Sequence, residues 1–236
     1  MVDERVIAIV RLLGLEHLHK VPSIKLDHTL ITEFVERWRP KTHSFHLLHG
    51  EMTITLQDVE VIIGMPIEGE AMVRFTKRIW KSVCNEMLGI QILDENKTVL
   101  DGQRIQIKAL VDRIAQSLPL DANELQVHQY ARCYVLALLR DMVFVDKSGD
   151  RVHIMWLEFM ENLNDPPKYS WGSAALSWLY RQLCKASEKT AKQIGGTLIL
   201  VQLWIYAKFS HMSPQKVPPP EGVYGPPPPP IPFAMK

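Results

Sequence analysis

Three histidines lie close together in the stretch THSFHLLHGEMTITLQD, and their types and spacing come nearest to a chemical site in this chain. They are His43, His46 and His49, and two acidic residues follow them within the same stretch. Histidine is a common zinc ligand and a common general base. The stretch therefore raises the hypothesis of a metal centre or a catalytic loop.

The residues around these histidines predict a β-hairpin instead. The run SFHLL is followed by His49-Gly50 and then by the β-prone run EMTIT. A two-residue turn with glycine second joins two strands, which places one small hairpin near residues 44–55. Side chains alternate between the faces of a strand, so His43 and His46 would point in opposite directions and could not share one ion. We expect no metal site here.

The other motifs that resemble chemistry are incomplete. DKSGD resembles the start of a calcium loop, but Arg151 and Leu157 stand where that loop needs glycine and glutamate. The sequence has no P-loop, no dinucleotide-binding glycine motif and no nucleophile elbow. Lys108 and Lys185 fall in charged helical patterns with no glycine-rich phosphate loop nearby, which argues against a pyridoxal site. We expect no catalytic residue and no cofactor.

The cysteines predict a reducing environment. Cys84, Cys133 and Cys184 are far apart and form no CxxC pair, so they encode neither a disulfide framework nor a zinc knuckle. Cys133 and Cys184 fall on apolar helical faces, which is typical of core residues rather than of nucleophiles. We expect an intracellular protein.

The bulk composition is that of a globular domain. The chain has 236 residues, of which 47% are hydrophobic and 22% charged, enough for one domain with a sizeable core. A net charge of +1 argues against a surface devoted as a whole to nucleic acid. The most apolar run, residues 194–209, is shorter than the roughly 20 residues that a membrane span needs. We expect it to form a buried helix and expect no membrane span.

Helical periodicity predicts the fold class: mainly α, a single compact helical domain over residues 1–212 with one small β-hairpin near residues 44–55. Residues 213–236 are rich in proline and predict a polyproline II tail or linker. Its docking to a proline-reading domain is the alternative that we favour less. The predicted helices cover about residues 3–13, 26–40, 55–64, 75–89, 102–118, 121–144, 152–163, 165–189 and 196–210.

Capping residues strengthen three of these helices. Asp27 is a plausible N-cap of its helix. Thr55 and Asp58 form a capping box, with Gly64 as the helix stop. Asp121 and Glu124 have the same spacing at the start of another helix.

Four basic residues share one predicted helix face. Arg74, Lys77, Arg78 and Lys81 recur at helical spacing, opposite an apolar stripe. Such a face could contact nucleic-acid phosphates or an acidic partner. A solvated face is the alternative that we favour, because no aromatic residues are interleaved with these cations.

Three aromatic residues flank the Pro-Pro break at residues 166–167. We consider Trp156, Tyr169 and Trp171 as candidate partner contacts, because aromatic side chains beside a rigid turn are often half exposed. Core packing is the alternative for each of them.

The phrase LITEFVERWRPKTHSFHLLHGEMTITLQDVEVIIGMPIEG resembles the plant mobile domain family, and YSWGSAALSWLYRQLC and GGTLILVQLWIYAKF match the same family in the same order. The resemblance spans roughly residues 3–210. This family includes the MAIN-like proteins, domains linked to plant serine/threonine phosphatases of the phosphatase-7 class, and transposon-borne copies. It is also labelled aminotransferase-like.

The resemblance implies a nuclear protein-interaction module that acts with a phosphatase-like partner in gene expression control, transposon silencing and meristem maintenance. Because the chain shows no pyridoxal setting, we expect a non-enzymatic module despite the family's label. One alternative is a transposon-derived nucleic-acid-binding module that uses the basic helix face. The other is an enzyme with a diverged pyridoxal site.

Overall fold

The computed structural model describes residues 2–21, 24–73, 80–92, 99–145, 149–188 and 194–214. Within them the chain is mainly helical with two small antiparallel sheets, which confirms the predicted fold class. The α-helices are α1 (Glu4–Leu12), α2 (Glu16–Lys20), α3 (His28–Glu36), α4 (Leu56–Ile63), α5 (Trp80–Leu88), α6 (Ile107–Ala115), α7 (Glu124–Leu138), α8 (Trp171–Ala186) and α9 (Leu198–Lys208). The strands are β1 (Trp38–Arg39), β2 (Ser44–Leu47), β3 (Gly50–Met52), β4 (Leu100–Asp101), β5 (Arg104–Gln106) and β6 (Arg151–His153).

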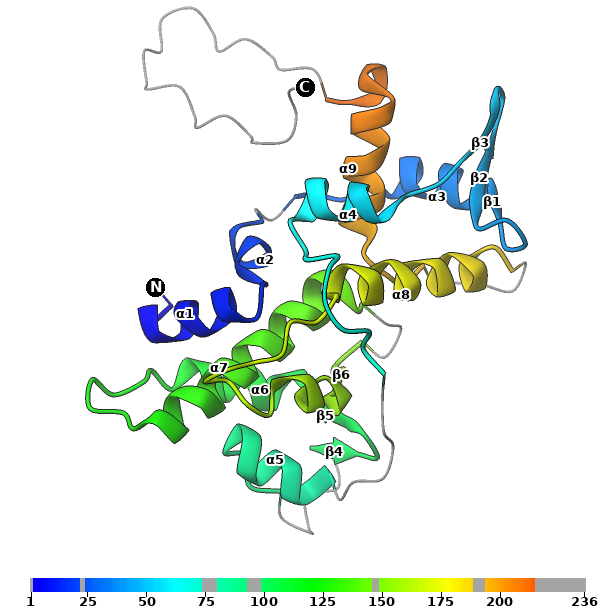
Figure 1. Cartoon of the computed structure of the whole chain (residues 1–236). Helices are drawn as coiled ribbons and strands as arrows, with labels where there is room; N and C mark the ends of the chain where they lie inside the picture. The colour runs from blue at the N-terminus through cyan, green and yellow to red at the C-terminus, as the bar shows by residue number, and fades with distance from the viewer. Residues whose placement is uncertain are drawn as a thin grey trace, which may run out of the picture.

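Helix α7 is the central helix of one half of the molecule, and α8 lies between this half and the other half. Figure 1 shows α1, α5 and α6 around α7, α8 crossing the middle, and α3, α4, α9 and the β2–β3 hairpin on the far side of α8. Helix α7 contacts α1, α5 and α6, whereas α9 contacts α3 and α4. The hairpin projects away from α7, at the edge of the molecule (Figure 1).

The predicted helix signals around the first sheet are confirmed. Asp27 caps α3, its carboxylate accepting from the backbone N–H of Leu30 at 3.0 Å. Thr55 and Asp58 form both bonds of a capping box at the start of α4. Gly64 ends α4 with a φ of 67°, a left-handed conformation that suits glycine.

The predicted hairpin is present, but its turn is one residue earlier than predicted. Leu47 pairs with Gly50, so Leu48 and His49 form the two-residue turn instead of His49 and Gly50. In this register Phe45, which is fully buried, pairs with Trp38 on one side and with Met52 on the other.

A third strand joins this hairpin where the sequence predicted the end of a helix. Helix α3 ends at Glu36, and β1 pairs with β2. Pro40 disfavours helical backbone at the residue before it, which is Arg39.

The second sheet, β4–β5–β6, was not predicted. Residues 104–106 and 151–153 form strands where helical starts were expected, and residues 154–160 form a 3-10 helix, η2 (Ile154–Met160). The Ile105–Val152 pair joins residues far apart in sequence, which local periodicity does not reveal.

Helix α7 is shorter than predicted. Asn123 and Gln126, not Asp121 and Glu124, form its capping box. After Leu138 the chain continues as a π-helix, η1 (Leu139–Val143). The short helix α2 was also missed.

Some predictions fall wholly or partly outside the described residues. The predicted helix 75–89 is seen from Trp80 onward. Residues 215–236 of the proline-rich segment are not described, so the division at residue 212 stays a prediction. No described helix is long and apolar enough to cross a membrane, and α9 is a buried helix as predicted, with Trp204 fully buried.

Candidate functional site

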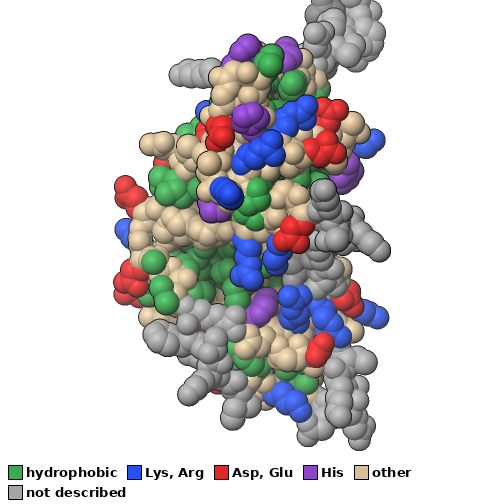
Figure 2. Space-filling model, turned by 90° about the vertical axis from the view of Figure 1, so that its right-hand side faces the viewer, with side chains coloured by type: hydrophobic (Ala, Val, Ile, Leu, Met, Phe, Trp, Pro, Cys, Tyr) green, Lys and Arg blue, Asp and Glu red, His purple; other side chains and the backbone are tan. Residues whose placement is uncertain are grey.

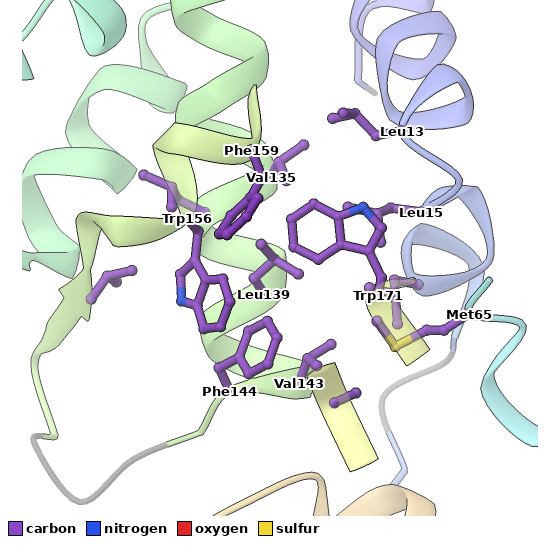
Figure 3. Close-up of a cluster of buried hydrophobic side chains, with 14 of the residues drawn as sticks. Leu13, Leu15, Met65, Val135, Leu139, Val143, Phe144, Trp156, Phe159 and Trp171 are labelled. Carbon is purple, nitrogen blue, oxygen red and sulfur yellow. The ribbon is translucent and has the colours of Figure 1, made fainter. Parts of the chain in front are cut away.

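Trp156 and Trp171 lie in the hydrophobic core. Their exposed fractions are 7% and 1%. Figure 3 shows them on either side of Phe159, with Phe144 against Trp156. The rings of Phe144 and Trp156 stack with centroids 3.7 Å apart. Helix α8 begins at Trp171, and Figure 3 shows that indole between Phe159 and Leu15, so core packing describes both tryptophans.

Tyr169 is the candidate aromatic contact that keeps part of its surface. It is half-buried, and its ring meets that of Phe159 edge to face at 5.1 Å. Its backbone bridges to Glu70, so the segment before α8 is held in place. Its role as a partner contact stays a prediction.

The predicted basic helix face is described only in part. Lys81 is exposed on the first turn of α5, whereas Arg74, Lys77 and Arg78 lie outside the described residues. The opposite apolar stripe is present, with Trp80, Cys84, Met87 and Leu88 buried.

The three histidines do not converge. The ring of His43 stacks on that of Tyr180 in α8, with centroids 5.4 Å apart. His46 Nδ1 lies 3.7 Å from the Glu51 carboxylate, and His49 occupies the hairpin turn. Among the described residues no three histidines, cysteines or carboxylates come together as metal ligands would.

Instead, the histidine stretch is anchored on α8. Tyr180 donates its hydroxyl proton to the Ile54 carbonyl at 2.6 Å, and Thr53 donates to the His43 carbonyl at 2.6 Å. These two hydroxyls are 2.8 Å apart. The Trp38 indole N–H points to Cys184 Sγ at 3.3 Å. The first sheet is therefore a fixed platform rather than a loose hairpin.

The cysteines and lysines with possible chemistry are poorly placed for it. Burial raises the pKa of the Cys84 and Cys133 thiols to about 12 each, which keeps them protonated and inert. Cys184 is half-buried against Trp38. Lys108 and Lys185 are exposed on α6 and α8.

Sequence reasoning missed a buried charge, Arg132. Its guanidinium donates to the carbonyls of Met160 and Glu161 at 2.8 Å each, and to that of Met87 at 3.4 Å. Desolvation lowers the pKa of Arg132, although the charge is offset by these carbonyl dipoles. Arg132 thus ties α7 to the ends of α5 and η2. A charged residue inside the apolar pattern YARCYVLALL was the available signal.

A cleft of about 570 Å³ lies between the end of α5, α6 and the segment before α7. Its lining includes Ile90, Ala109, Arg113, Gln116 and Leu118. Ser117 is its single described hydroxyl, with no histidine or cysteine beside it in this lining. The lining therefore holds no serine–histidine or cysteine–histidine pair.

Comparisons with known proteins point to a single family. The model of the plant mobile domain family matches residues 14–230. In Arabidopsis thaliana, a serine/threonine-protein phosphatase 7 long form homolog is 39% identical over 196 residues, covering 83% of this chain and 14% of the relative. Protein MAIN-LIKE 2 is 35% identical over 200 residues, covering 85% and 29% respectively.

Protein MAINTENANCE OF MERISTEMS of the same plant is 34% identical over 202 residues, covering 85% of this chain and 41% of the relative. The chain thus spans less than half the length of each of these relatives. No solved structure matches the chain significantly.

Proposed function

The chain belongs to the plant mobile domain family, and we propose that it is a non-enzymatic protein-interaction module of the nucleus. The observation that carries the proposal is the placement of this sequence within its relatives. The region similar to this chain makes up 14% of a protein named for a phosphatase and 29% of Protein MAIN-LIKE 2. A domain that recurs in proteins of such different length behaves as a transferable module.

The partner that we propose is a phosphatase-like protein of the phosphatase-7 class. The support is the 39% identity to a relative that bears that name. The processes that we propose are gene expression control and transposon silencing, which come from the family resemblance. Similarity to a protein named for meristem maintenance supports a role in plant development.

The placement of the reactive side chains supports a non-enzymatic role. Catalysis by a cysteine or histidine needs an accessible, activated group. Cys84 and Cys133 are buried, and the exposed His43 packs one face of its ring on Tyr180. The exposed Lys108 and Lys185 lack the enclosed pocket that a pyridoxal cofactor needs.

Size-exclusion chromatography with light scattering tests the proposal. The whole chain is mixed with the catalytic domain of a plant phosphatase of the phosphatase-7 class. We expect a stable complex whose mass is the sum of one copy of each. Two separate peaks across the concentration range would contradict a direct partnership.

The alternative, nucleic-acid binding, is tested by the same chromatography with duplex DNA in place of the phosphatase domain. That reading predicts binding that weakens steeply with salt and is lost when Arg74, Lys77, Arg78 and Lys81 are replaced by glutamine. The net charge of +1 argues against it.

A further inference from the structure

The outer face of the first sheet carries an unusual concentration of cations. We call it the cationic sheet face and define it as Arg37, Arg39, Lys41, His46 and Glu51. Side chains alternate along a strand. Since Trp38 and Phe45 are buried on the core side, Arg37, Arg39 and His46 beside them point outward, and all three are exposed.

Strand pairing brings these residues together. The Arg37 carbonyl accepts from the His46 backbone N–H at 2.8 Å, and His46 pairs with Glu51 across β2 and β3. Arg39 pairs with Ser44 in the next row. Strands in a sheet are ~4.8 Å apart, so Arg37, Arg39, His46 and Glu51 form one continuous patch, and Lys41 follows in the turn between β1 and β2.

The charges on this face are not balanced within it. It carries three cations, Arg37, Arg39 and Lys41, but a single carboxylate, that of Glu51. Hydrogen bonds from Ser44 and then Thr42 lower the pKa of Glu51, so hydroxyls rather than the arginines hold that carboxylate. Arg37 has an ion pair with Glu33 at 3.9 Å.

Two of the cations have no such partner. Within the described parts of the chain, Arg39 and Lys41 form no ion pair, and both are exposed. Their charges are therefore available to a ligand.

The patch is rigid and prominent. The β1–β2 turn is fixed to α8 through the stacked rings of His43 and Tyr180. Figure 2 views the molecule from the hairpin side and shows His, Lys and Arg side chains over its upper part, with Asp and Glu side chains among them. At the tip of the hairpin the Leu48 side chain is 92% exposed. A preorganised surface loses little conformational entropy on binding, which favours its use as a docking site.

We infer that the cationic sheet face, with Leu48 beside it, binds an acidic segment of a partner protein. This inference rests on the proposed function, because it names the surface through which the module meets its partner. Charge complementarity selects the ligand. A duplex-DNA site typically neutralises 6–10 phosphates, roughly two to three times the number of cations on this face. A short acidic peptide segment fits the two available cations, the neighbouring Arg37 and one apolar tip better.

The first test measures fluorescence anisotropy of a labelled peptide of alternating glutamate and leucine, with labelled duplex DNA alongside. Charge reversal in Arg39→Glu/Lys41→Glu is expected to weaken peptide binding by at least about tenfold. Lys108→Glu/Lys168→Glu makes the same change in net charge at exposed lysines elsewhere and is expected to stay within about twofold. Leu48→Ser should cause a smaller loss than the charge reversal.

The neutral double variant Arg39→Gln/Lys41→Gln controls for misfolding caused by the charge reversal. It is expected to bind the peptide with intermediate affinity. Equal peptide binding by all variants would overturn the inference. DNA binding that is tighter than peptide binding and is lost in Arg39→Glu/Lys41→Glu would overturn it too, because the face would then bind nucleic acid.

The closing experiment separates this inference from the proposed function by repeating the phosphatase-domain chromatography with the same variants. A complex formed by the wild-type chain and by Lys108→Glu/Lys168→Glu, but not by Arg39→Glu/Lys41→Glu, supports the inference. A complex formed by the wild-type chain and by all variants overturns the inference but agrees with the proposed function. If the wild-type chain forms no complex, the proposed function fails and the peptide measurement alone decides whether this face binds acidic segments.

Discussion

The imidazole of His43 stacks on the phenol ring of Tyr180, with ring planes 25° apart and centroids separated by 5.4 Å. His43 is also the only described non-glycine residue with a positive φ, 51°. Left-handed backbone costs a non-glycine residue roughly 1 kcal/mol, and neighbouring contacts must offset that cost. The contact with α8 therefore holds the turn that presents Lys41 and Arg39 in a conformation it would not favour alone.

Replacing Tyr180 by phenylalanine tests this anchor. Burial raises the pKa of Tyr180, so its hydroxyl stays protonated and donates to the Ile54 carbonyl. Tyr180→Phe keeps the ring but removes that bond and the contact with Thr53. We expect the free energy of unfolding in urea to fall by about 1–2 kcal/mol. Tyr180→Ala should cost more, and equal stability of Tyr180→Phe and the wild type would mean that the hydroxyl is not part of the anchor.

The pair formed by Asp58 and Lys208 predicts a pH-dependent stability. Burial alone would raise the pKa of Asp58, but the Thr55 backbone N–H and the Lys208 ammonium, 3.0 Å away, lower it on balance. A pKa that is lower in the folded chain adds stability above the unfolded value near 4, and that stability is lost as the pH falls through the folded value.

Asp58→Asn should therefore lower the free energy of unfolding by about 1 kcal/mol at pH 7, and by less as the pH falls below about 4. Urea titrations at several pH values measure this difference. In a Lys208→Met background the effect of Asp58→Asn should shrink. A difference that is independent of both pH and Lys208 would refute the pair.

Local chemistry made part of this structure predictable. The N-caps at Asp27 and Thr55 and the stop at Gly64 depend on residues within one helical turn, so the sequence contains all of their determinants. The hairpin was found for the same reason, although its turn lies one residue earlier than predicted.

Nonlocal contacts account for what was missed. Residues 151–153 become a strand because β5 is available beside them, and a helical pattern in one segment cannot show that. The partners of Arg132 are carbonyls at the ends of other elements. The cationic sheet face depends on β1 pairing with β2, which places Arg37 and Arg39 beside His46.

Arg132 offers a test of the core around α7. Arg132→Met leaves three carbonyls without this donor: the buried bonds to Met160 and Met87 and the part-buried bond to Glu161 are all lost. We expect a loss of about 3 kcal/mol in the free energy of unfolding. The matched control, Arg181→Met, changes an exposed arginine of α8 and should stay within about 0.5 kcal/mol. Equal effects of the two substitutions would contradict a structural role for Arg132.

Thiol reactivity tests the placement of the cysteines. Cys84 and Cys133 are fully buried with a pKa of about 12 each, whereas Cys184 is half-buried. With Ellman's reagent near pH 8 we expect only Cys184 to react in the native chain, and the other two to react after unfolding. Cys184→Ser should abolish the native reaction. Rapid modification of that variant would show that Cys84 or Cys133 is accessible.

Hydrogen–deuterium exchange of the whole chain, with and without the phosphatase-7-class catalytic domain, tests the central claim most directly. It reports both whether a partner binds and where. The account predicts that a saturating amount of partner slows exchange in residues 37–52, which span β1 to β3, and leaves α6 and α7 unchanged. Exchange that is unaltered along the whole chain would contradict the proposal that this domain is an interaction module for that partner.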